Sequence, residues 1–390
     1  MSMSRILSRM LDTLEPQLVR TLYMKAKEYD NVIDLTLGDP DLPTPQQVID
    51  AGCKAMRSGK THYTANAGLL ELRKAISEDI LRRLNIQYDP KTEIIVTPGA
   101  MGALSLSSMC LLNPDDEVLI LAPHWPNYTN MVRICSAIPI DIPCYGDEHL
   151  STLRNRLEAA FTSRTRLLIL NSPCNPSGQV LTRDILSGIA SFAVAHDLTV
   201  LSDEVYHALL FNGKAHESIL GLPGMHGRSV LVDSMSKRFC MTGWRVGYAA
   251  APSAIIEKMT ELQEHVSSCV APFAQLAAVE ALKTGETDVQ RFIDVFSRRC
   301  LFMAQRLNQI PLLHCELPLA TFYLFVDIRA TGLSSMAFAL KLLEAEQVAL
   351  VPGIAFGACA EGFIRIACTV SEEKLENACV RIGRFLSGLS

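Results

Sequence analysis

Short aliphatic runs separated by helical patterns are the feature that most restricts what this chain can fold into. Such runs occupy residues 117–122 (EVLILA), 166–170 (RLLIL), 198–201 (LTVL), 229–232 (SVLV) and 245–250 (RVGYAA). They are apolar throughout rather than alternating, as expected for strands of a parallel sheet that helices cover on both faces. Between two runs, Thr182 is a suitable N-cap for a helix over 183–196, where Ile185, Ile189 and Phe192 repeat at helical spacing. The pattern predicts an α/β fold with a mostly parallel sheet flanked by helices on both faces.

The two ends of the chain follow different patterns. Residues 1–44 contain an amphipathic stretch, and the Pro-rich segment GDPDLPTP at 38–45 suits an elbow between units. From about Thr284, long helical patterns surround a strand candidate at 321–328 (TFYLFVDI), and a last helix begins near Ser371. We therefore expect an N-terminal arm (1–44) that joins a small domain, a large domain (45–283) and a smaller C-terminal α+β domain (284–390).

Composition excludes several classes of protein. The 390 residues are 49% hydrophobic with a formal net charge of -5, which argues against disorder and against nucleic acid as a partner. No apolar run approaches the ~18 residues of a membrane span, and Asp12 and Glu15 closely follow the basic start, unlike a targeting peptide. The 12 cysteines form no Cys-x-x-Cys pair and the 9 histidines show no ligand spacing. We expect a cytoplasmic protein with reduced thiols, no metal site and no membrane partner.

Chemically capable side chains follow four of the predicted strands. Trp125 comes after the run at 117–122, Asn175 after 166–170, Asp203 and Tyr206 after 198–201, and Lys237 after 229–232. Ligands of open parallel sheets gather outside the carboxyl ends of the strands. The spacing therefore predicts that these side chains share one site.

The segments around these residues resemble a known family. SMSKRFCMTGWRVGY at 234–248, NSPCNPSG at 171–178 and SDEVY at 202–206 are similar to class I/II aminotransferases of fold type I, the aspartate aminotransferase superfamily. The likeness extends to LGDPDLPTP from Leu37, YTANAGLLELRKAI from Tyr63, VTPGAMGAL from Val96, VPGIAFG from Val351 and FIRIA from Phe363, in the family's order. It implies pyridoxal phosphate (PLP), bound by the large domain, as the cofactor. It also implies a homodimer whose substrates are an amino acid and a 2-oxo acid.

The resemblance assigns cofactor contacts residue by residue. Lys237 resembles the Schiff-base lysine, which attacks the cofactor aldehyde when neutral and later moves the substrate Cα proton. Asp203 resembles the partner of the pyridine nitrogen, Tyr206 and Asn175 the donors to the 3′ oxygen, and Trp125 the ring stacked on the pyridine. The phosphate contacts implied in this way are the backbone N–H groups of Ala100 and Met101 at a helix start, Ser234, Ser236, Arg245 and Tyr63 of the partner subunit.

The substrate contacts implied by the resemblance are fewer. Arg365 is the candidate for the α-carboxylate, with Asn175 assisting and Gly38 bringing the backbone close. Relatives specific for dicarboxylates place an arginine within the segment that corresponds to 264–272 (EHVSSCVAP), and some aspartate-using relatives carry a lysine at the position of Met101. This chain has neither residue. A neutral or aromatic amino donor is therefore slightly favoured over a dicarboxylate.

These motifs predict ping-pong transamination, in which an amino acid leaves as a 2-oxo acid and a second 2-oxo acid takes the amine. A PLP-dependent β-eliminating C–S lyase is the first alternative, because the same carbanion can expel a leaving group. A non-catalytic ligand sensor on the same fold is the second alternative. Such regulators carry an added DNA-binding domain, for which the residues before the 38–45 elbow leave no room.

Overall fold

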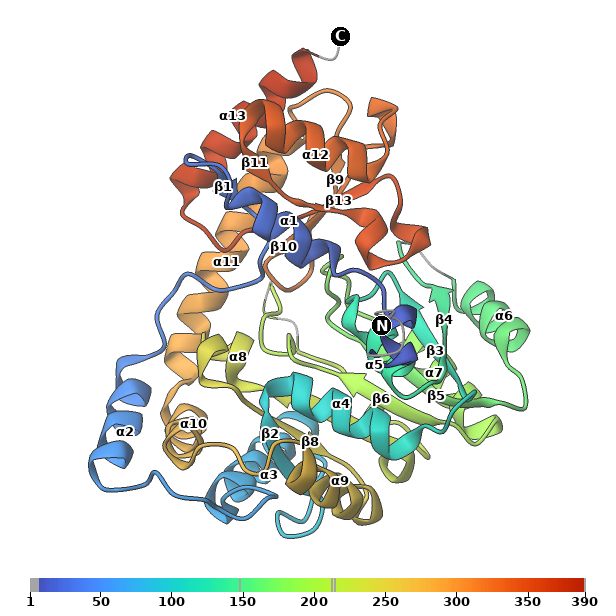
Figure 1. The fold of residues 1–390 in the computed structure, drawn as a ribbon, viewed down its shortest axis with the longest axis vertical. Coiled ribbons are helices and arrows are strands. Elements are labelled where there is room, and N and C mark those ends of the chain that lie inside the picture. The colour runs from blue at the N-terminus through green and yellow to red at the C-terminus, as the bar shows by residue number, and fades with distance from the viewer. Residues whose placement is uncertain (1–6, 147–148, 212, 214, 389–390) are drawn as a thin grey trace.

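The computed structural model describes residues 7–146, 149–211, 213 and 215–388. Residues 1–6 of the predicted arm and 389–390 of the predicted small domain lie outside the described part. Figure 1 shows a lower unit built around a large sheet and a smaller upper unit of helices and short strands. The long helix α11 (Glu286–Leu307) runs from the lower unit into the upper one.

The lower unit is organised around a seven-stranded sheet in the order β2-β8-β7-β6-β5-β3-β4. All strands from β7 to β4 pair in parallel, whereas β8 is antiparallel to both of its neighbours. The strands are β2 (Ile94–Pro98), β3 (Glu117–Ala122), β4 (Ile138–Pro143), β5 (Thr165–Asn171), β6 (Thr199–Asp203), β7 (Ser229–Ser234) and β8 (Val246–Ala250). The sheet is therefore mostly parallel, as predicted.

Helices cover both faces of this sheet because successive strand residues point to opposite sides. In β5, Leu168 and Leu170 join the core shared with α2, α3, α6, α7 and α10, whereas Leu167 and Ile169 join the core shared with α4, α5 and α9. The first group is α2 (Gln46–Arg57), α3 (Leu70–Leu84), α6 (Leu150–Ala160), α7 (Arg183–Ala195) and α10 (Pro272–Thr284). The second is α4 (Gly99–Leu111), α5 (Asn127–Ile134) and α9 (Ser253–Val266). The expected cap of α7 is confirmed, since Thr182 Oγ1 accepts a hydrogen bond from the Ile185 amide.

The upper unit has its own core and two small sheets. An antiparallel sheet has the order β12-β13-β10-β9, and β1 pairs in parallel with β11. These strands are β1 (Ile33–Asp34), β9 (His314–Cys315), β10 (Tyr323–Asp327), β11 (Val348–Ala349), β12 (Val351–Pro352) and β13 (Phe363–Ala367). The helices are α1 (Leu18–Ala26), α11, α12 (Ser335–Glu346) and α13 (Glu372–Ser387). The expected strand near 321–328 and the expected last helix are both present.

The N-terminal arm reaches the upper unit. Ile33 and Asp34 extend the backbone pairing of β11, and Leu22 and Leu35 are buried in the core formed mainly by α11, α12 and α13. These contacts support the proposed division into an arm (1–44) that joins the small domain (284–390) and a large domain (45–283). The boundaries themselves stay a proposal.

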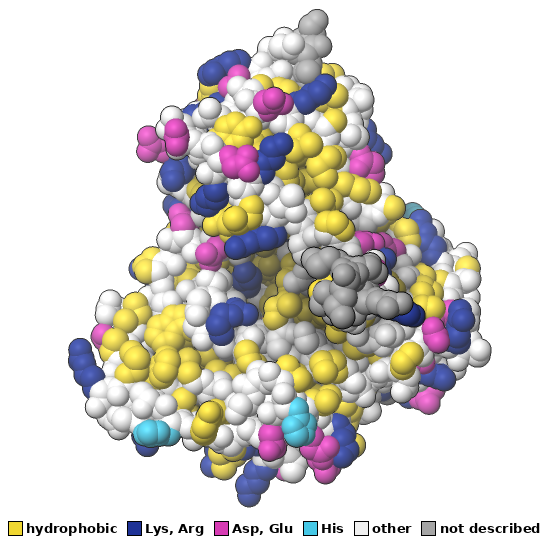
Figure 2. Space-filling view, in the orientation of Figure 1, with side chains coloured by type: hydrophobic (Ala, Val, Ile, Leu, Met, Phe, Trp, Pro, Cys, Tyr) yellow, Lys and Arg dark blue, Asp and Glu magenta, His cyan; other side chains and the backbone are white. Residues whose placement is uncertain are grey.

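The visible face carries charges of both signs. In Figure 2 the Lys and Arg side chains are dispersed among Asp and Glu side chains rather than gathered on one area of this face. Within the described ranges, no helix is long and apolar enough to cross a membrane.

Candidate active site

The carboxyl ends of the parallel strands open into one cavity of about 270 Å³. Asn171 at the end of β5 is paired in register with Asp203 at the end of β6, which aligns the loops that follow the two strands. Every predicted site residue except Tyr63 lines this cavity: Gly38, Ala100, Met101, Trp125, Asn175, Asp203, Tyr206, Ser234, Ser236, Lys237, Arg245 and Arg365. The other lining residues are Val19, Leu37, Tyr128, Asn171, Val205, Thr242 and Tyr323. The fold thus places all of the predicted site residues except Tyr63 around one cavity.

One wall of the cavity is the start of α4, where the first N–H groups of a helix have no partner within the helix. Gly99 opens α4 with φ +70°, and a Cβ built there would lie 2.5 Å from Nη2 of Arg245. The glycine therefore lets the guanidinium lie directly against the helix start. Ser234 and Ser236 line the same cavity. Helix amides, hydroxyls and a guanidinium together suit a phosphate group.

Lys237 sits on the short helix α8 (Met235–Arg238), and its Nζ donates a hydrogen bond of 2.6 Å to the Gly38 carbonyl. Burial of the amine lowers the pKa of Lys237 to about 8, although Asp39 partly opposes the shift, and Arg365 and Arg245 add to it. An appreciable neutral fraction therefore exists near neutral pH. A neutral amine is the form that attacks a carbonyl carbon.

Asp203 is a buried carboxylate without a cationic partner in the described part of the chain. Its Oδ2 accepts a hydrogen bond of 2.6 Å from the Tyr128 hydroxyl, and its Oδ1 accepts one of 3.2 Å from the Val205 amide. Burial raises the pKa of Asp203 to about 7, against the effect of these hydrogen bonds. The surroundings therefore suit a ligand that brings positive charge to this carboxylate, as a protonated pyridine nitrogen does.

Arg365 in β13 is a buried cation that makes no ion pair with any described residue. Nη1 donates to Oδ1 of Asn175 at 2.9 Å, Nη2 donates to the Thr36 carbonyl, and Nε has no partner. The guanidinium lies over the rings of Tyr323 and Phe356, with its carbon 4.4 and 5.0 Å from their centroids. Burial lowers the pKa of Arg365. A buried cation in this state is suited to a carboxylate supplied by a ligand.

Two tyrosines of the cavity were missed in the sequence. Tyr128, the donor to Asp203, stands edge-on to Trp125 with ring centroids 5.6 Å apart. Tyr323 hydrogen-bonds Tyr206 through their hydroxyls at 3.1 Å and packs against Gly38, where a built Cβ would lie 1.6 Å from the Tyr323 hydroxyl oxygen. The signal available for Tyr128 was its place three residues after Trp125 on the same strand-end segment. Tyr323 carried only a strand pattern.

Tyr63 lies apart from the cavity. Its side chain is 89% exposed, and it borders a separate hollow of about 600 Å³ with His62 and Leu70. A contribution of Tyr63 to the site of a partner subunit stays a prediction.

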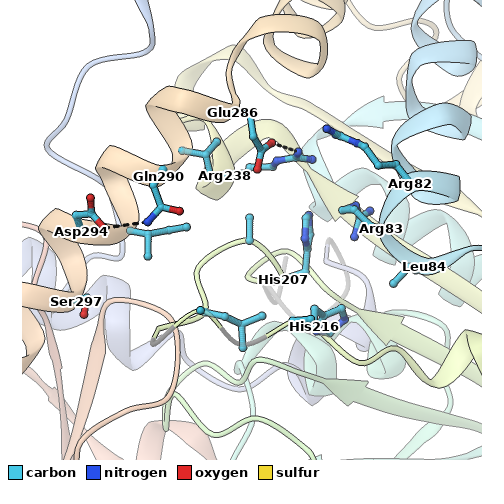
Figure 3. Close-up of a pocket in the computed structure, with 16 residues that line it drawn as sticks. Arg82, Arg83, Leu84, His207, His216, Arg238, Glu286, Gln290, Asp294 and Ser297 are labelled. Atoms are coloured by element: carbon cyan, nitrogen blue, oxygen red, sulfur yellow. Dashed lines mark hydrogen bonds and ion pairs between the residues drawn. The ribbon is translucent and has the colours of Figure 1, made fainter.

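A second, larger cavity of about 710 Å³ contains none of the predicted residues (Figure 3). It is lined by charged side chains of several segments, among them Arg83 of α3, His207, Arg238 of α8 and Glu286 of α11. These residues form ion pairs with one another and with buried acids behind them. Among the described residues, no cluster of His, Cys, Asp or Glu could hold a metal ion.

The comparisons agree with this geometry. The family model for aminotransferase class I and II matches residues 30–382. The aspartate aminotransferase of Pyrococcus abyssi is 40% identical over 382 residues, and the aromatic-amino-acid aminotransferase 2 of Thermococcus litoralis is 37% identical over 382 residues; each match covers 97% of this chain and 98% of the relative. The crystal structure of the aromatic aminotransferase from Pyrococcus horikoshii OT3 matches with a TM-score of 0.88 and 40% identity, over 94% of this chain and 99% of that one.

Sequence, fold and cavity thus lead to one family. The mostly parallel sheet flanked by helices is the fold of its solved members, and PLP is the cofactor with which its members transfer amino groups. This chain therefore belongs to the class I and II aminotransferases and is a PLP-dependent enzyme of fold type I.

Proposed function

We propose that this aminotransferase moves the amino group of a neutral or aromatic L-amino acid to a 2-oxo acid. One observation carries the proposal. The same cavity holds the buried guanidinium of Arg365, which forms no ion pair with any described residue and whose Nε has no partner, and the amine of Lys237, whose pKa is lowered. An amino acid whose α-carboxylate is bound by Arg365 exposes its Cα and amino group to the Lys237 side of the cavity. The planar fork of Arg365 matches both carboxylate oxygens.

In this proposal each residue of the cavity has its own role in cofactor binding or proton transfer. Ser234, Ser236, Arg245 and the amides of Ala100 and Met101 would hold the cofactor phosphate, Trp125 would cover the ring, and Asn175 and Tyr206 would bind its 3′ oxygen. Asp203, held in place by Tyr128, would bind the pyridine nitrogen and keep it protonated. Once bound, PLP supplies an electron sink for negative charge at the substrate Cα. Lys237 takes the Cα proton and returns it as general base and acid.

The preference for a neutral side chain rests on the remaining walls. Among the described lining residues, the cations are Lys237, Arg245 and Arg365, and each already has a role. Val19, Leu37 and Met101 add apolar surface. No lining cation is left for a side-chain carboxylate, so an apolar or aromatic side chain fits better. The relatives are named for both aspartate and aromatic amino acids, and their names alone do not decide between these donors.

The proposal is tested by supplying the twenty amino acids with 2-oxoglutarate, pyruvate or oxaloacetate and measuring both products. We expect equal amounts of new 2-oxo acid and new amino acid, with higher kcat/KM for aromatic or apolar donors than for aspartate. Release of pyruvate and ammonia from cysteine-like substrates, without amine transfer to any acceptor, would establish the C–S lyase instead. Higher kcat/KM for aspartate would refute the substrate preference alone.

The role of Lys237 is tested separately. Lys237→Ala should lower turnover by more than about a thousandfold, because it removes both the Schiff-base amine and the proton carrier. The variant should still bind PLP through the phosphate cradle, which equilibrium dialysis with PLP measures. In wild-type protein borohydride should abolish the visible absorbance and fix the cofactor covalently to the chain, whereas in Lys237→Ala the reduced cofactor should stay separable from the denatured chain. Turnover by the variant within tenfold of wild type would exclude this role.

We propose further that the active unit is a homodimer in the cytoplasm. The exposed Tyr63 and the neighbouring hollow support a contact with a second copy. The 12 cysteines form no Cys-x-x-Cys pair, which fits a protein of a reducing compartment. Mixing Lys237→Ala and Tyr63→Ala subunits should restore up to about a quarter of wild-type activity, because half of the randomly formed dimers then hold one intact site. No restoration in subunits shown to exchange would exclude a shared site.

A further inference from the structure

The helix that carries Lys237 is too short to fix its own direction. α8 comprises only Met235–Arg238, a single turn, and one turn of helix is not stable without outside contacts. Met235 and Phe239 are buried in the apolar core, which sets how deep the segment lies. Rotation of the turn about these apolar contacts would swing the Lys237 amine away from its direction. A directional contact is therefore needed as well.

Arg238, the residue after Lys237, makes contacts of this kind. Its side chain is 6% exposed, and Nη1 donates to both carboxylate oxygens of Asp79 in α3 at 3.0 Å. Nη2 donates to Oε2 of Glu286 at 2.9 Å, the contact drawn as a dashed line in Figure 3. Asp79 is buried, whereas the Glu286 side chain is 69% exposed. The planar guanidinium thus ties the lysine-bearing turn to two other helices in a fixed orientation.

The ion pairs of Arg238 belong to a larger group of charged residues that lies next to the residues of the catalytic cavity. We call Asp79, Arg83, Glu204, His207, His216, Asp233, Arg238 and Glu286 the back cluster. Four of its members are the immediate sequence neighbours of cavity residues, namely Glu204 beside Asp203, His207 beside Tyr206, Asp233 beside Ser234, and Arg238 beside Lys237. His207 Nε2 lies 3.1 Å from Oδ2 of Asp233, and His216 Nε2 lies 2.8 Å from Oε2 of Glu204. The back cluster therefore adjoins several of the residues assigned to the cofactor.

Glu286 connects the back cluster to the upper unit. It is the first residue of α11, the helix that Figure 1 shows passing from the lower unit to the upper one. One turn further, Val289 packs in the core of the large sheet, whereas Phe292, Phe296 and Met303 pack in the core of the upper unit. A shift of the upper unit along α11 thus acts directly at Glu286 and, through the hydrogen bond, at Arg238.

We propose that Arg238 is a positioning residue for Lys237 and that its contact with Glu286 makes the position of the Lys237 amine depend on α11. The Asp79 contact holds α8 in the folded protein, and the Glu286 contact adjusts its orientation. This inference rests on the proposed role of Lys237 in transamination.

The test compares Glu286→Gln with Asp294→Asn in full-length protein loaded with PLP. Asp294 is a matched control, since it lies on α11 and lines the same 710 Å³ cavity as Glu286. Its Oδ1 accepts a hydrogen bond of 2.9 Å from Gln290 and makes no ion pair with Arg238. Both changes remove one negative charge from the same helix, but only Glu286→Gln weakens the contact with Arg238. Arg238→Lys keeps the charge and loses the two-armed geometry.

Glu286→Gln should lower kcat about two- to fivefold, as expected for one partly exposed ion pair, and leave KM unchanged within twofold. The pH midpoint of the visible absorbance of the bound cofactor should shift by a few tenths of a unit, because a rotation of α8 moves the lysine nitrogen relative to Arg365 and Arg245, the cations that help to lower its pKa. Arg238→Lys should lower kcat about tenfold or more, and Asp294→Asn should change neither quantity.

An equal shift in Asp294→Asn would mean that only the general charge of α11 acts, and would overturn the proposal. An unchanged midpoint and kcat in Glu286→Gln would overturn it as well. A failure of the underlying transaminase assignment has a different signature, since wild-type protein itself would then transfer no amine from any donor to a 2-oxo acid. Such a result would overturn both conclusions at once.

Discussion

Two buried arginines in this enzyme have opposite surroundings. Arg238, in the back cluster, has two carboxylates within 3.0 Å. Arg365, in the catalytic cavity, has only an amide oxygen, a backbone carbonyl and two aromatic rings among the described residues. Burying a charge costs free energy unless it is paired. The fold thus neutralises the charge of Arg238, which joins three helices, and leaves the charge of Arg365, proposed to bind the substrate carboxylate, without a carboxylate partner among the described residues.

Two buried carboxylates, Asp79 and Asp203, differ in the same way as the two arginines. Burial alone would raise the pKa of Asp79, but Arg238 and Arg83 outweigh it and hold that pKa well below its usual range. Asp203 is buried to the same degree, has no such cations, and its pKa is raised to about 7. Burial is equal in the two regions, so the difference lies in the partners. The cavity thus contains a buried acid, Asp203, and a buried base, Arg365, that have no ion-pair partner among the described residues. A ligand that carries charges of both signs could pair with them.

Replacement of Asp79 should have the largest effect on the difference between the paired and the unpaired arginine. Asp79→Ala leaves Arg83 and Arg238 buried without their shared carboxylate, so unfolding should become easier by about 3–5 kcal/mol. Urea denaturation followed by circular dichroism measures this loss. Asp294→Ala, which removes an acid from the rim of the adjoining cavity, serves as the control and should stay within about 0.5 kcal/mol of wild type. Equal stabilities for the two variants would show that the back cluster contributes no structural stability.

Arg365→Met tests the other side of the comparison. Removing the unpaired cation should raise the KM of amino acid substrates about a hundredfold, equivalent to about 2.7 kcal/mol of lost carboxylate binding. Stability should stay the same or rise, because no acid loses its partner. Steady-state kinetics and urea denaturation of the same preparations give both values. A loss of stability comparable to that of Asp79→Ala would place Arg365 among the structural arginines.

A third prediction concerns a pH dependence of stability that belongs to Asp203. Since its folded-state pKa of about 7 lies above the ordinary 3.8, the folded apoprotein binds a proton that the unfolded chain has released. Its stability should therefore fall relative to Asp203→Asn as pH rises from about 4 to 7, by at most about 1.4 kcal/mol per pH unit. Above pH 7 the difference should stay constant. A difference between the two apoproteins that does not change with pH would contradict the raised pKa.

The contrast also explains what the sequence could predict. Trp125, Asn175, Asp203 and Lys237 follow strand patterns directly, so the parallel sheet was enough to place them together. Glu204 and Arg238 stand within the motifs quoted above, but Asp79 and Arg83 of α3 and Glu286 of α11 belong to none of them. These residues come together only through the tertiary fold. Charged residues on helices are usually solvent-exposed, so residue type alone did not predict that Asp79 is buried with Ile76 and Ile80 of α3.

Two features of the sheet were outside the reach of pattern reading. β8 has the same apolar character as its neighbours, yet it is antiparallel, because the 235–245 connection is too short for a helical crossover. β4 was not expected as a strand, since its IPIDIP sequence contains two prolines and lies at the sheet edge with several residues exposed. Edge strands carry little of the continuous hydrophobicity that marked the central ones.

The contact between Gly38 and Tyr323 has an evolutionary consequence. Every amino acid replacement at Gly38 adds a Cβ, which would lie 1.6 Å from the Tyr323 hydroxyl oxygen and 2.6 Å from the ring carbon that bears it. Loss of the hydroxyl alone would not make room, and a smaller residue at 323 would strip Arg365 of one of its aromatic neighbours. The loop, the strand and the guanidinium are therefore bound to vary together, and lineages that change one of them are expected to carry compensating changes in the other two.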